Sequence, residues 1–410
     1  MVINKQLFNT QYKSIFSFLV FTTGISAPAF SADITTSGNL SLETRLFQHD
    51  GAFEGQGDSS VSLSFQPEVT SKWDNDHKSF TFIPFYRWDS EDDERSHGDI
   101  RQLDATASKG DWEVQGGISK VFWGVTESQH LVDIINQTDT VDGVDGEDKL
   151  GQPMLRVSRI MDDGSLDIFV LPYFRERTFP GLAGRFRLPT VIDADNPSYE
   201  SDDEEKHVDY AARLNKTLGD FDVGLSYFDG TSRQPSFTKG LKNGEPVLIP
   251  HYSLMNQVGL DFQYTGEAII WKLEALNRRY DKPLNKDYSA AVGGFEYTIP
   301  AITIGGGDLG LLAEYHNDSR GEKGGSAFQN DVFLGARLSL NDEDSSQLLA
   351  GAFIDLDNGS KSFRLEASKR MGKGLKLNIE GQLFTDIDDK DPTNVFSQDD
   401  HVQIELQKYF

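Results

Sequence analysis

The strongest constraint on the fold is an alternation of apolar and polar residues that repeats along most of the chain. The segment 332-VFLGARLSL-340 places an apolar residue at every second position, and 375-LKLNIEGQL-383 repeats the pattern. Successive side chains of a β-strand point to opposite faces, so this spacing predicts strands with one apolar face. We find about 18 such segments of about 10–14 residues each, with about 16 as the alternative count. One stretch, 127-ESQHLVDIINQ-137, has a spacing that fits a short helix.

The connections between these segments sort into two kinds that alternate almost regularly. Tight, turn-like connections such as WDNDH, SKGD and TLGD alternate with long polar ones. The long ones include 125–151, 176–205, 230–251, 318–328 and 387–399. A soluble sandwich also alternates apolar and polar faces, but it has no reason to sort its loops in this way. The pattern predicts an all-β fold: a closed antiparallel transmembrane β-barrel with short periplasmic turns and long extracellular loops.

The first 32 residues differ from the rest and resemble a secretory signal peptide. Lys5 and Lys13 precede and flank an apolar stretch, SIFSFLVFTT, which small residues follow. This stretch is too short to cross a bilayer as a helix. Cleavage after Ala32 puts Phe30 at the −3 position, and cleavage after Ser31 or Ala29 is an alternative. We therefore expect residues 1–32 to be a signal peptide and residues 33–410 to form the barrel.

One face of the strands carries charged residues of both signs, and we expect this face to line a water-filled lumen. A barrel of about 18 strands is wide enough for an aqueous channel, and charges at this density need water. The candidate pore-lining residues are Glu43, Arg45, Arg87, Arg156, Arg213, Lys272, Glu274, Arg337, Arg364 and Glu366. The alternative for each residue is a charge that only pairs with a neighbour and hydrates the wall.

Aromatic residues and prolines mark strand ends and irregularities. Two sets of aromatics fit the two interfaces of a membrane. The long-loop set is Tyr86, Trp88, Phe122, Phe174, Tyr227, Tyr280, Tyr315 and Phe384. The turn set is Trp73, Trp112, Tyr264, Tyr297 and Phe410. Pro67, Pro84 and Pro172 fall within segments with the strand pattern, where we expect bulges or bends because proline cannot donate to the ladder.

The segment 125–151 is the most distinctive loop, and we expect it to fold into the lumen and narrow it. Its candidate constriction residues are Glu127, His130, Asp133, Asn136 and Asp139. The alternative is an ordinary exposed loop. Acidic runs at 89–99, 139–148 and 201–205 could hold calcium, since carboxylate oxygens are calcium ligands. None has the EF-hand spacing, so solvated loops remain the alternative and we expect no other cofactor.

Composition and missing motifs exclude several function classes. The chain has no cysteine, so it forms neither disulfides nor cysteine-ligated metal sites. A formal charge of −26 disfavours nucleic acid as a partner. The GxSxG, HExxH and P-loop patterns are missing, 305-GGGDLG-310 fits a turn, and the eight histidines are scattered. We expect no enzymatic activity.

The segment 101–139 resembles large, poorly characterised Gram-negative outer-membrane barrels, which are distantly similar to alginate-export-type and general porins. A strand pair with the pattern GDW…G…WG is followed by D-x-x-N-x-x-D. The matching residues are Gly110, Asp111, Trp112, Gly117, Trp123, Gly124, Asp133, Asn136 and Asp139. The runs 294-GFEYT-298, 309-LGLLAEY-315, 331-DVFLGARLSLND-342 and 348-LLAGAFIDLD-357 are also similar to this class. The resemblance implies a passive or facilitated pore and transfers no catalytic residue.

The last segment, 401-HVQIELQKYF-410, has to pair with the first strand, because an open sheet edge in hydrocarbon leaves backbone amides unsatisfied. Tyr409 and Phe410 are the candidate signal for the barrel-assembly machinery. The expected function is a porin-like channel for hydrophilic small-molecule solutes in the bacterial outer membrane, in contact with its lipids and lipopolysaccharide. The alternative is a plugged barrel with a structural or surface-binding role.

Overall fold

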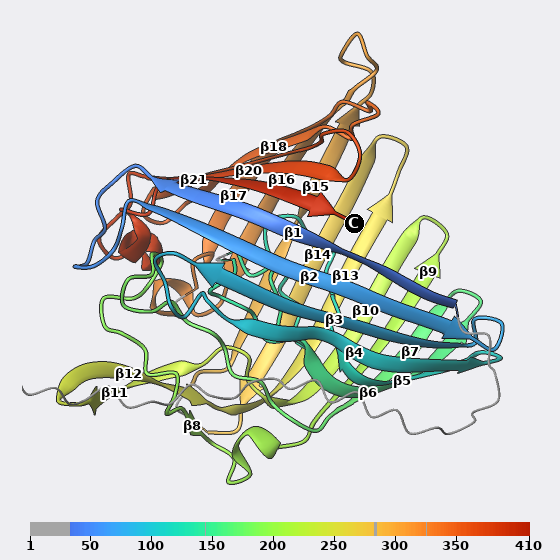
Figure 1. The fold of residues 1–410 in the computed structure, drawn as a ribbon, viewed down its shortest axis with the longest axis horizontal. Coiled ribbons are helices and arrows are strands. Elements are labelled where there is room, and N and C mark those ends of the chain that lie inside the picture. Colours follow the sequence, from blue (N-terminus) through green and yellow to red (C-terminus); the bar gives the residue numbers. More distant parts are fainter. Residues whose placement is uncertain (1–32, 144, 283–284, 325) are drawn as a thin grey trace, which may run out of the picture.

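In the computed structural model, the chain closes into an antiparallel barrel of 18 strands (Figure 1). The structure describes residues 33–410 except 144, 283–284 and 325, so the expected signal peptide, 1–32, lies outside the described residues. The first half of the wall consists of β1 (Asp33–Phe47), β2 (Ser59–Trp73), β3 (Lys78–Asp89), β4 (Gly98–Lys109), β5 (Trp112–Ser119), β6 (Gln152–Met161), β7 (Gly164–Leu171), β9 (Asp209–Leu218) and β10 (Phe221–Thr231). The second half consists of β13 (Leu254–Thr265), β14 (Ile269–Tyr280), β15 (Tyr288–Ile299), β16 (Asp308–Asp318), β17 (Asn330–Ser339), β18 (Gln347–Asp355), β19 (Lys361–Arg370), β20 (Leu375–Thr385) and β21 (His401–Tyr409).

Closure comes from the pairing of the last strand with the first. β21 runs antiparallel to β1 from Asn39 opposite Tyr409 to Phe47 opposite His401. Beyond the last pair, the Phe410 amide donates to the Gly38 carbonyl at 3.1 Å, and the Phe410 ring stacks on Phe65. The predicted closed barrel of about 18 strands is confirmed, and the alternative of 16 strands is wrong.

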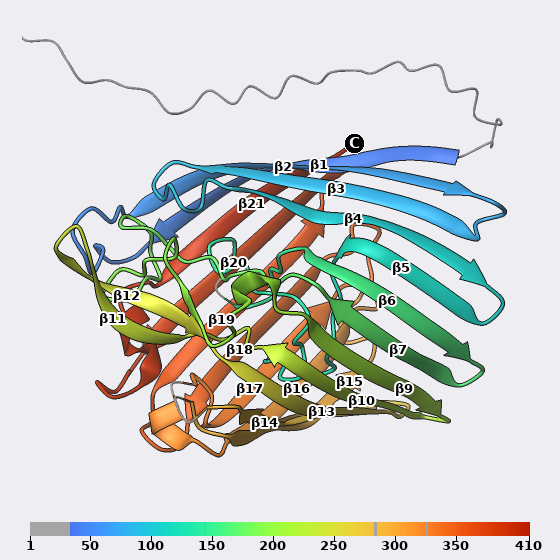
Figure 2. The ribbon, with the colours of Figure 1, turned by 90° about the horizontal axis from the view of Figure 1, so that it is seen from below.

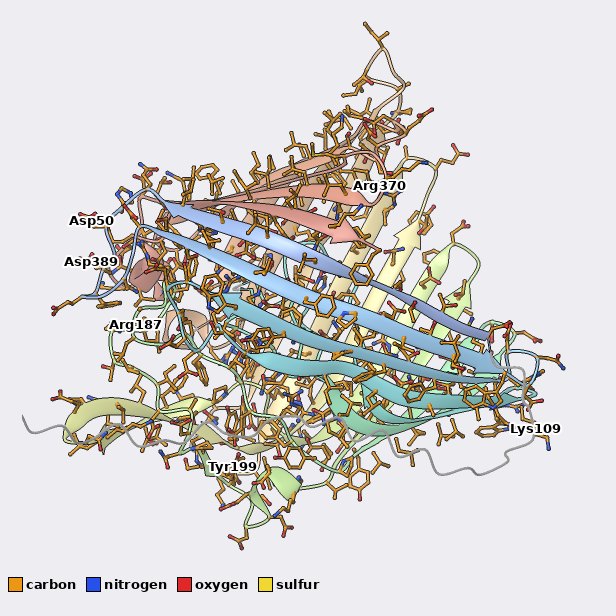
Figure 3. The ribbon with its side chains drawn as sticks, in the orientation of Figure 1. Asp50, Lys109, Arg187, Tyr199, Arg370 and Asp389 are labelled. Atoms are coloured by element: carbon orange, nitrogen blue, oxygen red, sulfur yellow. The ribbon has the colours of Figure 1, made fainter. Side chains whose placement is uncertain are left out.

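The two ends of the barrel differ as the loop sorting predicted. Short turns connect β2 to β3, β4 to β5, β6 to β7 and β9 to β10, and the first of these places Asp74, Asn75 and Asp76 in the left-handed backbone region. The long connections gather at the opposite end, where Asp50, Arg187 and Asp389 lie, far from Lys109 at the turn end (Figure 3). We call these the turn end and the loop end.

The loop end contains more secondary structure than the sequence indicated. β11 (Ser236–Lys242) and β12 (Glu245–Tyr252) form a hairpin inside the connection treated as a polar loop, 230–251. β8 (Ser198–Tyr199) adds to β12 in parallel, and the resulting small sheet lies outside the ring of barrel strands (Figures 1 and 2). The short 3-10 helices η1 (Glu204–Lys206), η2 (Gly321–Gly324) and η3 (Pro392–Phe396) also lie in long connections.

Side-chain exposure follows the alternation. On β1, Leu42 and Leu46 are exposed, whereas Ser41 and Glu43 face inward and are buried. The barrel therefore carries an apolar band outside and a polar lining inside. No helix among the described residues is long and apolar enough to cross a membrane.

Two details at strand ends depart from the sequence analysis. Phe174 was expected at the membrane interface, but β7 ends at Leu171, and Phe174 is buried against Tyr252 in the loops. For the same reason Pro172 lies outside the strand. Pro84 does mark an irregularity, since the pairing of β3 with β4 shifts register between Ile83 and Pro84.

Candidate functional site

The connection from β5 to β6, residues 120–151, folds into the barrel and crosses its lumen. Two inward carboxylates on the opposite wall accept hydrogen bonds from its backbone. Glu274 on β14 accepts hydrogen bonds from the backbone amides of Val125 and Thr126 at 2.7 and 3.0 Å. Glu314 on β16 accepts from the amides of Glu127 and Ser128 at 2.8 and 2.9 Å. Charged acceptors make strong hydrogen bonds, so these two glutamates hold the loop against the far wall.

The predicted helix at 127–137 is wrong. This stretch has no regular secondary structure, because its amides donate to wall carboxylates instead of to carbonyls four residues earlier. Leu131, Ile134 and Ile135 nevertheless pack against buried apolar side chains. Ile134 and Ile135 belong to one apolar cluster, and Leu131 packs against a second.

The D-x-x-N-x-x-D pattern supplies the internal anchors of the loop. The Asn136 side chain accepts from the Val121 amide and donates to the carbonyls of Ser119 and Leu150, which joins the beginning of the loop to its end. Asp133 pairs with Lys149 at 3.1 Å, and burial raises its pKa.

Asp139, the last residue of that pattern, fastens the loop to the β4 side. It lies 2.7 Å from Arg101 and 3.0 Å from His97. Burial alone would raise its pKa, but the hydrogen bond from His97 and the charges of His97 and Arg101 outweigh it and lower the pKa of Asp139. The carboxylate therefore stays ionised and keeps both contacts.

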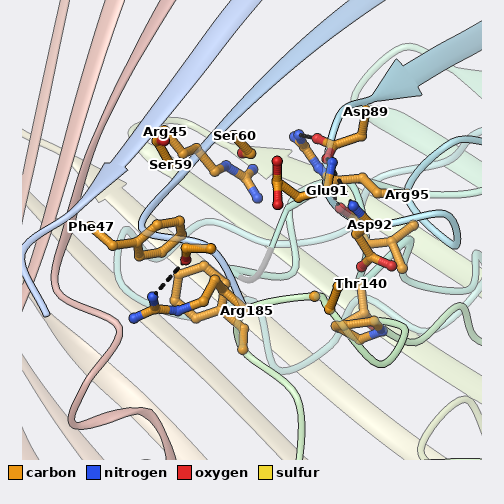
Figure 4. A pocket seen from close by; sticks show the side chains of 16 residues that line it. Arg45, Phe47, Ser59, Ser60, Asp89, Glu91, Asp92, Arg95, Thr140 and Arg185 are labelled. Carbon is orange, nitrogen blue, oxygen red and sulfur yellow. Dashed lines mark hydrogen bonds and ion pairs between the residues drawn. The ribbon is translucent and has the colours of Figure 1, made fainter. Parts of the chain in front are cut away.

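A buried network of arginines and carboxylates closes the lumen near β1 and β3. Glu43 accepts from Arg87 at 2.9 Å and from Arg95 at 2.8 Å, and Arg87 reaches Asp142 of the loop at 2.6 Å. Arg45 donates to the Asp142 carbonyl at 3.0 Å. Figure 4 shows the small cavity left beside this network, where Arg95 reaches Asp89. Buried charges are tolerated only when they are paired, as they are here.

An apolar core fills the lumen between the loop and the strands from β6 to β13. Trp123, Val132, Ile134 and Ile135 of the loop pack on wall side chains. The wall members of this core are Met154, Phe169, Leu171, Ala211, Phe228 and Met255. The Arg213 guanidinium lies 5.1 Å from the centre of the Trp123 ring. Arg213 also pairs with Asp261 at 2.8 Å. Packed apolar side chains therefore occupy this part of the lumen.

The other side of the lumen, along β17 to β21, stays open. A cavity of about 670 Å³ is lined by Arg337, Glu366, Lys376 and Glu380 among others. It shares Ser368 and Lys376 with a cavity of about 660 Å³ toward the turn end.

Two further cavities follow toward the loop end. The large cavity shares Glu127 and Glu366 with a smaller one of about 280 Å³, which we call the eyelet. The eyelet shares His130 and Glu147 with a cavity of about 640 Å³ at the loop end, which we call the vestibule. Adjoining cavities thus run from one end of the barrel to the other.

Ion pairs between the loop and the wall border the eyelet. Glu127 lies 2.5 Å from Arg337 on β17, and Asp145 lies 2.6 Å from Arg364 on β19. Lys272 is 4.0 Å from Glu127, so it joins the same group. These pairs fix the distance between the loop and the wall of β17 to β19.

The structure places the ten predicted pore-lining residues on the inward face but divides them by surroundings. Lys272, Arg337, Arg364 and Glu366 lie by the open side. Glu43, Arg87, Arg213 and Glu274 are buried in loop or wall contacts, which departs from the expected water-lined wall. Arg45 is largely covered by the loop, and Arg156 pairs with Glu113 at 2.6 Å. The predicted constriction residues all lie in the loop that crosses the lumen, with Glu127 and His130 at the eyelet.

Sequence reasoning missed Arg95 as a site residue. It lies in the acidic run 89–99, and its only signal was a lone arginine among carboxylates. In the part of the chain that the structure describes, no three His, Asp or Glu side chains come together as ligands of one metal ion, and calcium in the acidic runs stays a prediction.

No protein-family model matches the chain, and no curated protein matches it. Among solved structures, the chain is similar to OmpT, an outer membrane protein of Vibrio cholerae in its trimer form. The identity is 11% and the TM-score 0.50, over 92% of this chain and 99% of that one. A variant of Rh. blastica porin matches at 13% identity and a TM-score of 0.45, over 92% and 100%. The chain therefore shares the fold of outer-membrane β-barrel proteins.

Proposed function

We propose that this chain is an outer-membrane channel through which small hydrophilic solutes diffuse. The observation that carries the proposal is the run of adjoining cavities along β17 to β21, from the vestibule through the eyelet to the turn end. Charged side chains such as Arg337, Glu366 and Lys376 line it. Charged side chains at this density are stable beside a cavity only in contact with water, so water and water-soluble solutes suit the path. The proposal includes no catalytic reaction.

The outer surface supports a position in the outer membrane of a bacterium. Exposed apolar side chains such as Leu42, Leu273 and Leu365 point away from the lumen, where hydrocarbon would cover them. In the proposed membrane position, the short turns face the periplasm and the long loops contact lipopolysaccharide. Delivery by the barrel-assembly machinery, with Tyr409 and Phe410 as its signal, belongs to the same proposal.

A plugged barrel with a structural or surface-binding role is the second candidate. It is favoured by the pairs Glu127–Arg337 and Asp145–Arg364, which tie the loop to the wall of the open side. The two candidates differ in whether the eyelet conducts ions while these pairs are intact.

Conductance in planar lipid bilayers tests the proposal. The purified protein should produce discrete steps in potassium chloride, and deletion of 128–148 should enlarge each step because it removes Val132, Ile134 and Ile135 of the apolar core together with the Asp145–Arg364 pair. If the wild type is silent and only the deletion conducts, the plugged barrel is correct. Silence of both proteins, with the barrel shown to be folded by its circular dichroism, would refute the channel.

A further inference from the structure

The vestibule contains an excess of positive charge that pairing within the protein does not remove. Each of its carboxylates has a basic partner: Asp133 has Lys149, Glu147 has His130, Asp318 has Arg320 and Asp145 has Arg364. Arg233, another lining residue, pairs with Asp209 of β9 at 2.6 Å. Two further arginines of the lining, Arg177 and Arg278, have no carboxylate partner among the described side chains.

Arg278, on the inward face of β14, is buried and is held only by neutral groups. Its exposed fraction is 3%. Its Nε and Nη2 atoms donate to Gln257 Oε1 at 3.0 and 2.7 Å, and Nη1 donates to Gln234 Oε1 at 3.1 Å. Its guanidinium lies 5.4 Å from the centre of the Tyr288 ring. These contacts fix the orientation of the guanidinium and leave its charge uncompensated.

Arg177, in the connection after β7, lines the same cavity as Arg278. Its Nε donates to Gln137 Oε1 at 3.3 Å, and its terminal nitrogens donate to no described atom. Burial lowers the pKa of Arg177, and the positive charge of Arg278 lowers it further. Two like charges that are partly withdrawn from water repel each other, and an anion between them would turn this repulsion into attraction.

We propose that Arg177 and Arg278 form a binding site in the vestibule for the carboxylate or phosphate group of a small solute that approaches the eyelet. The free donors of Arg177 and the oriented guanidinium of Arg278 match the geometry of such oxyanions. Because the chain carries a net charge of −26, anions are repelled from it at a distance, and a local cationic site would concentrate them at the entrance. This inference rests on the proposed channel function and narrows its solutes to anions.

Binding is tested in two ways with sodium glucuronate, inorganic phosphate and uncharged glucose as probes. The first is block of the potassium chloride current in bilayers, and the second is equilibrium dialysis of labelled probe against the full-length protein in detergent micelles. Glucuronate or phosphate should bind and block, and glucose should do neither. The probe that binds more tightly identifies the carboxylate or the phosphate as the preferred group.

Four substitutions locate the site. Arg177→Gln and Arg278→Gln should each weaken the binding roughly tenfold or more, as expected for the loss of hydrogen bonds from a charged donor. Arg278→Lys keeps the charge and should retain part of the affinity, which would show that the loss in Arg278→Gln comes from the missing charge and not from misfolding. Arg279→Gln removes the same charge from the neighbouring residue on the outer face and should leave the affinity within about twofold.

Equal affinity of the wild type and both glutamine variants, or the lack of anion binding in dialysis, would overturn the site. Dialysis does not depend on conduction, so anion binding by a protein that passes no current would keep the site and reject the channel.

Discussion

The two sides of the lumen differ: apolar side chains fill the side along β6 to β13, which we call the sealed side, whereas cavities lie along the open side, β17 to β21. From β6 to β13 the wall presents Met154, Phe169 and Phe228 to the apolar side of the loop, and the space between is dry. From β17 to β21 the wall presents serine, lysine and glutamate side chains to cavities. The strand pattern is the same on both sides, so the difference lies in the inward residues.

The loop contacts each side by a different kind of interaction. On the sealed side, burial of apolar surface dominates, with buried charges paired around it. On the open side, the contacts are ion pairs at the edge of a cavity, such as Asp145 with Arg364. Apolar burial is insensitive to pH and salt, whereas partly exposed ion pairs weaken when salt screens them. The sealed side therefore fixes the loop, and in the proposed channel the open side sets the width and charge of the path.

The largest expected effect comes from filling the open side. Ser368 faces inward on β19 and borders two successive cavities. In the proposed channel, Ser368→Trp should reduce the single-channel conductance by roughly half or more, because the pore radius limits the current. Leu365→Trp, on the same strand, points outward and should conduct as the wild type does. Equal conductance of both variants and the wild type would show that the current takes another path.

A smaller effect is expected from a void on the sealed side. Ile135, a loop residue that packs in the apolar core, is fully buried. Ile135→Ala should lower the free energy of unfolding by about 2–4 kcal/mol, the usual result of truncating a large buried aliphatic side chain. Urea titration of the protein in lipid vesicles measures this change. Leu241→Ala, at an exposed position of the β11–β12 hairpin, is the matched control and should change the free energy little. An unchanged midpoint for Ile135→Ala would mean that the apolar core does not hold the loop.

The sequence predicted the wall better than the filling of the lumen. Strands and faces depend on neighbours two residues apart, so the pattern identified the barrel and the inward position of residues such as Glu274. It could not show which inward charges would be dry, because that depends on the path of the loop. Thr126 and Glu274 are 148 residues apart in sequence, and no local pattern reveals their hydrogen bond.

The same limit explains the errors at the site. The apolar spacing of Leu131, Ile134 and Ile135 correctly marks a buried side, but it indicated a helix because the wall acceptors for the loop amides were not visible in the sequence. Arg95 was overlooked because it lies in the connection after β3, whereas its partner Glu43 lies on β1, far away in the sequence. Conversely, D-x-x-N-x-x-D is local, and its three side chains do anchor the loop.

The smallest expected effect concerns pH at the end of the loop that borders the eyelet. His130 Nε2 lies 3.0 Å from Glu147, and Nδ1 lies 3.8 Å from Glu274. Burial opposes the charged form, but the hydrogen bond to Glu147 and the charges of Glu147 and Glu274 outweigh it and raise the pKa of His130 to about 10. The imidazolium is therefore present at neutral pH. Its pairing should stabilise the loop fully below the unfolded-state pKa near 6.5 and lose this contribution as pH rises through about 10.

The His130 ring can be followed directly by nuclear magnetic resonance of histidine-labelled protein in micelles. We expect no titration of this ring between pH 6 and 8. Above pH 10 the current should become noisier as the tie to Glu147 is lost, and His130→Gln should show this noise already at neutral pH because it cannot carry the charge. A ring that titrates near pH 6.5 would show that Glu147 and Glu274 do not hold the proton, and that Arg337 and Arg364 alone fasten the loop on the open side.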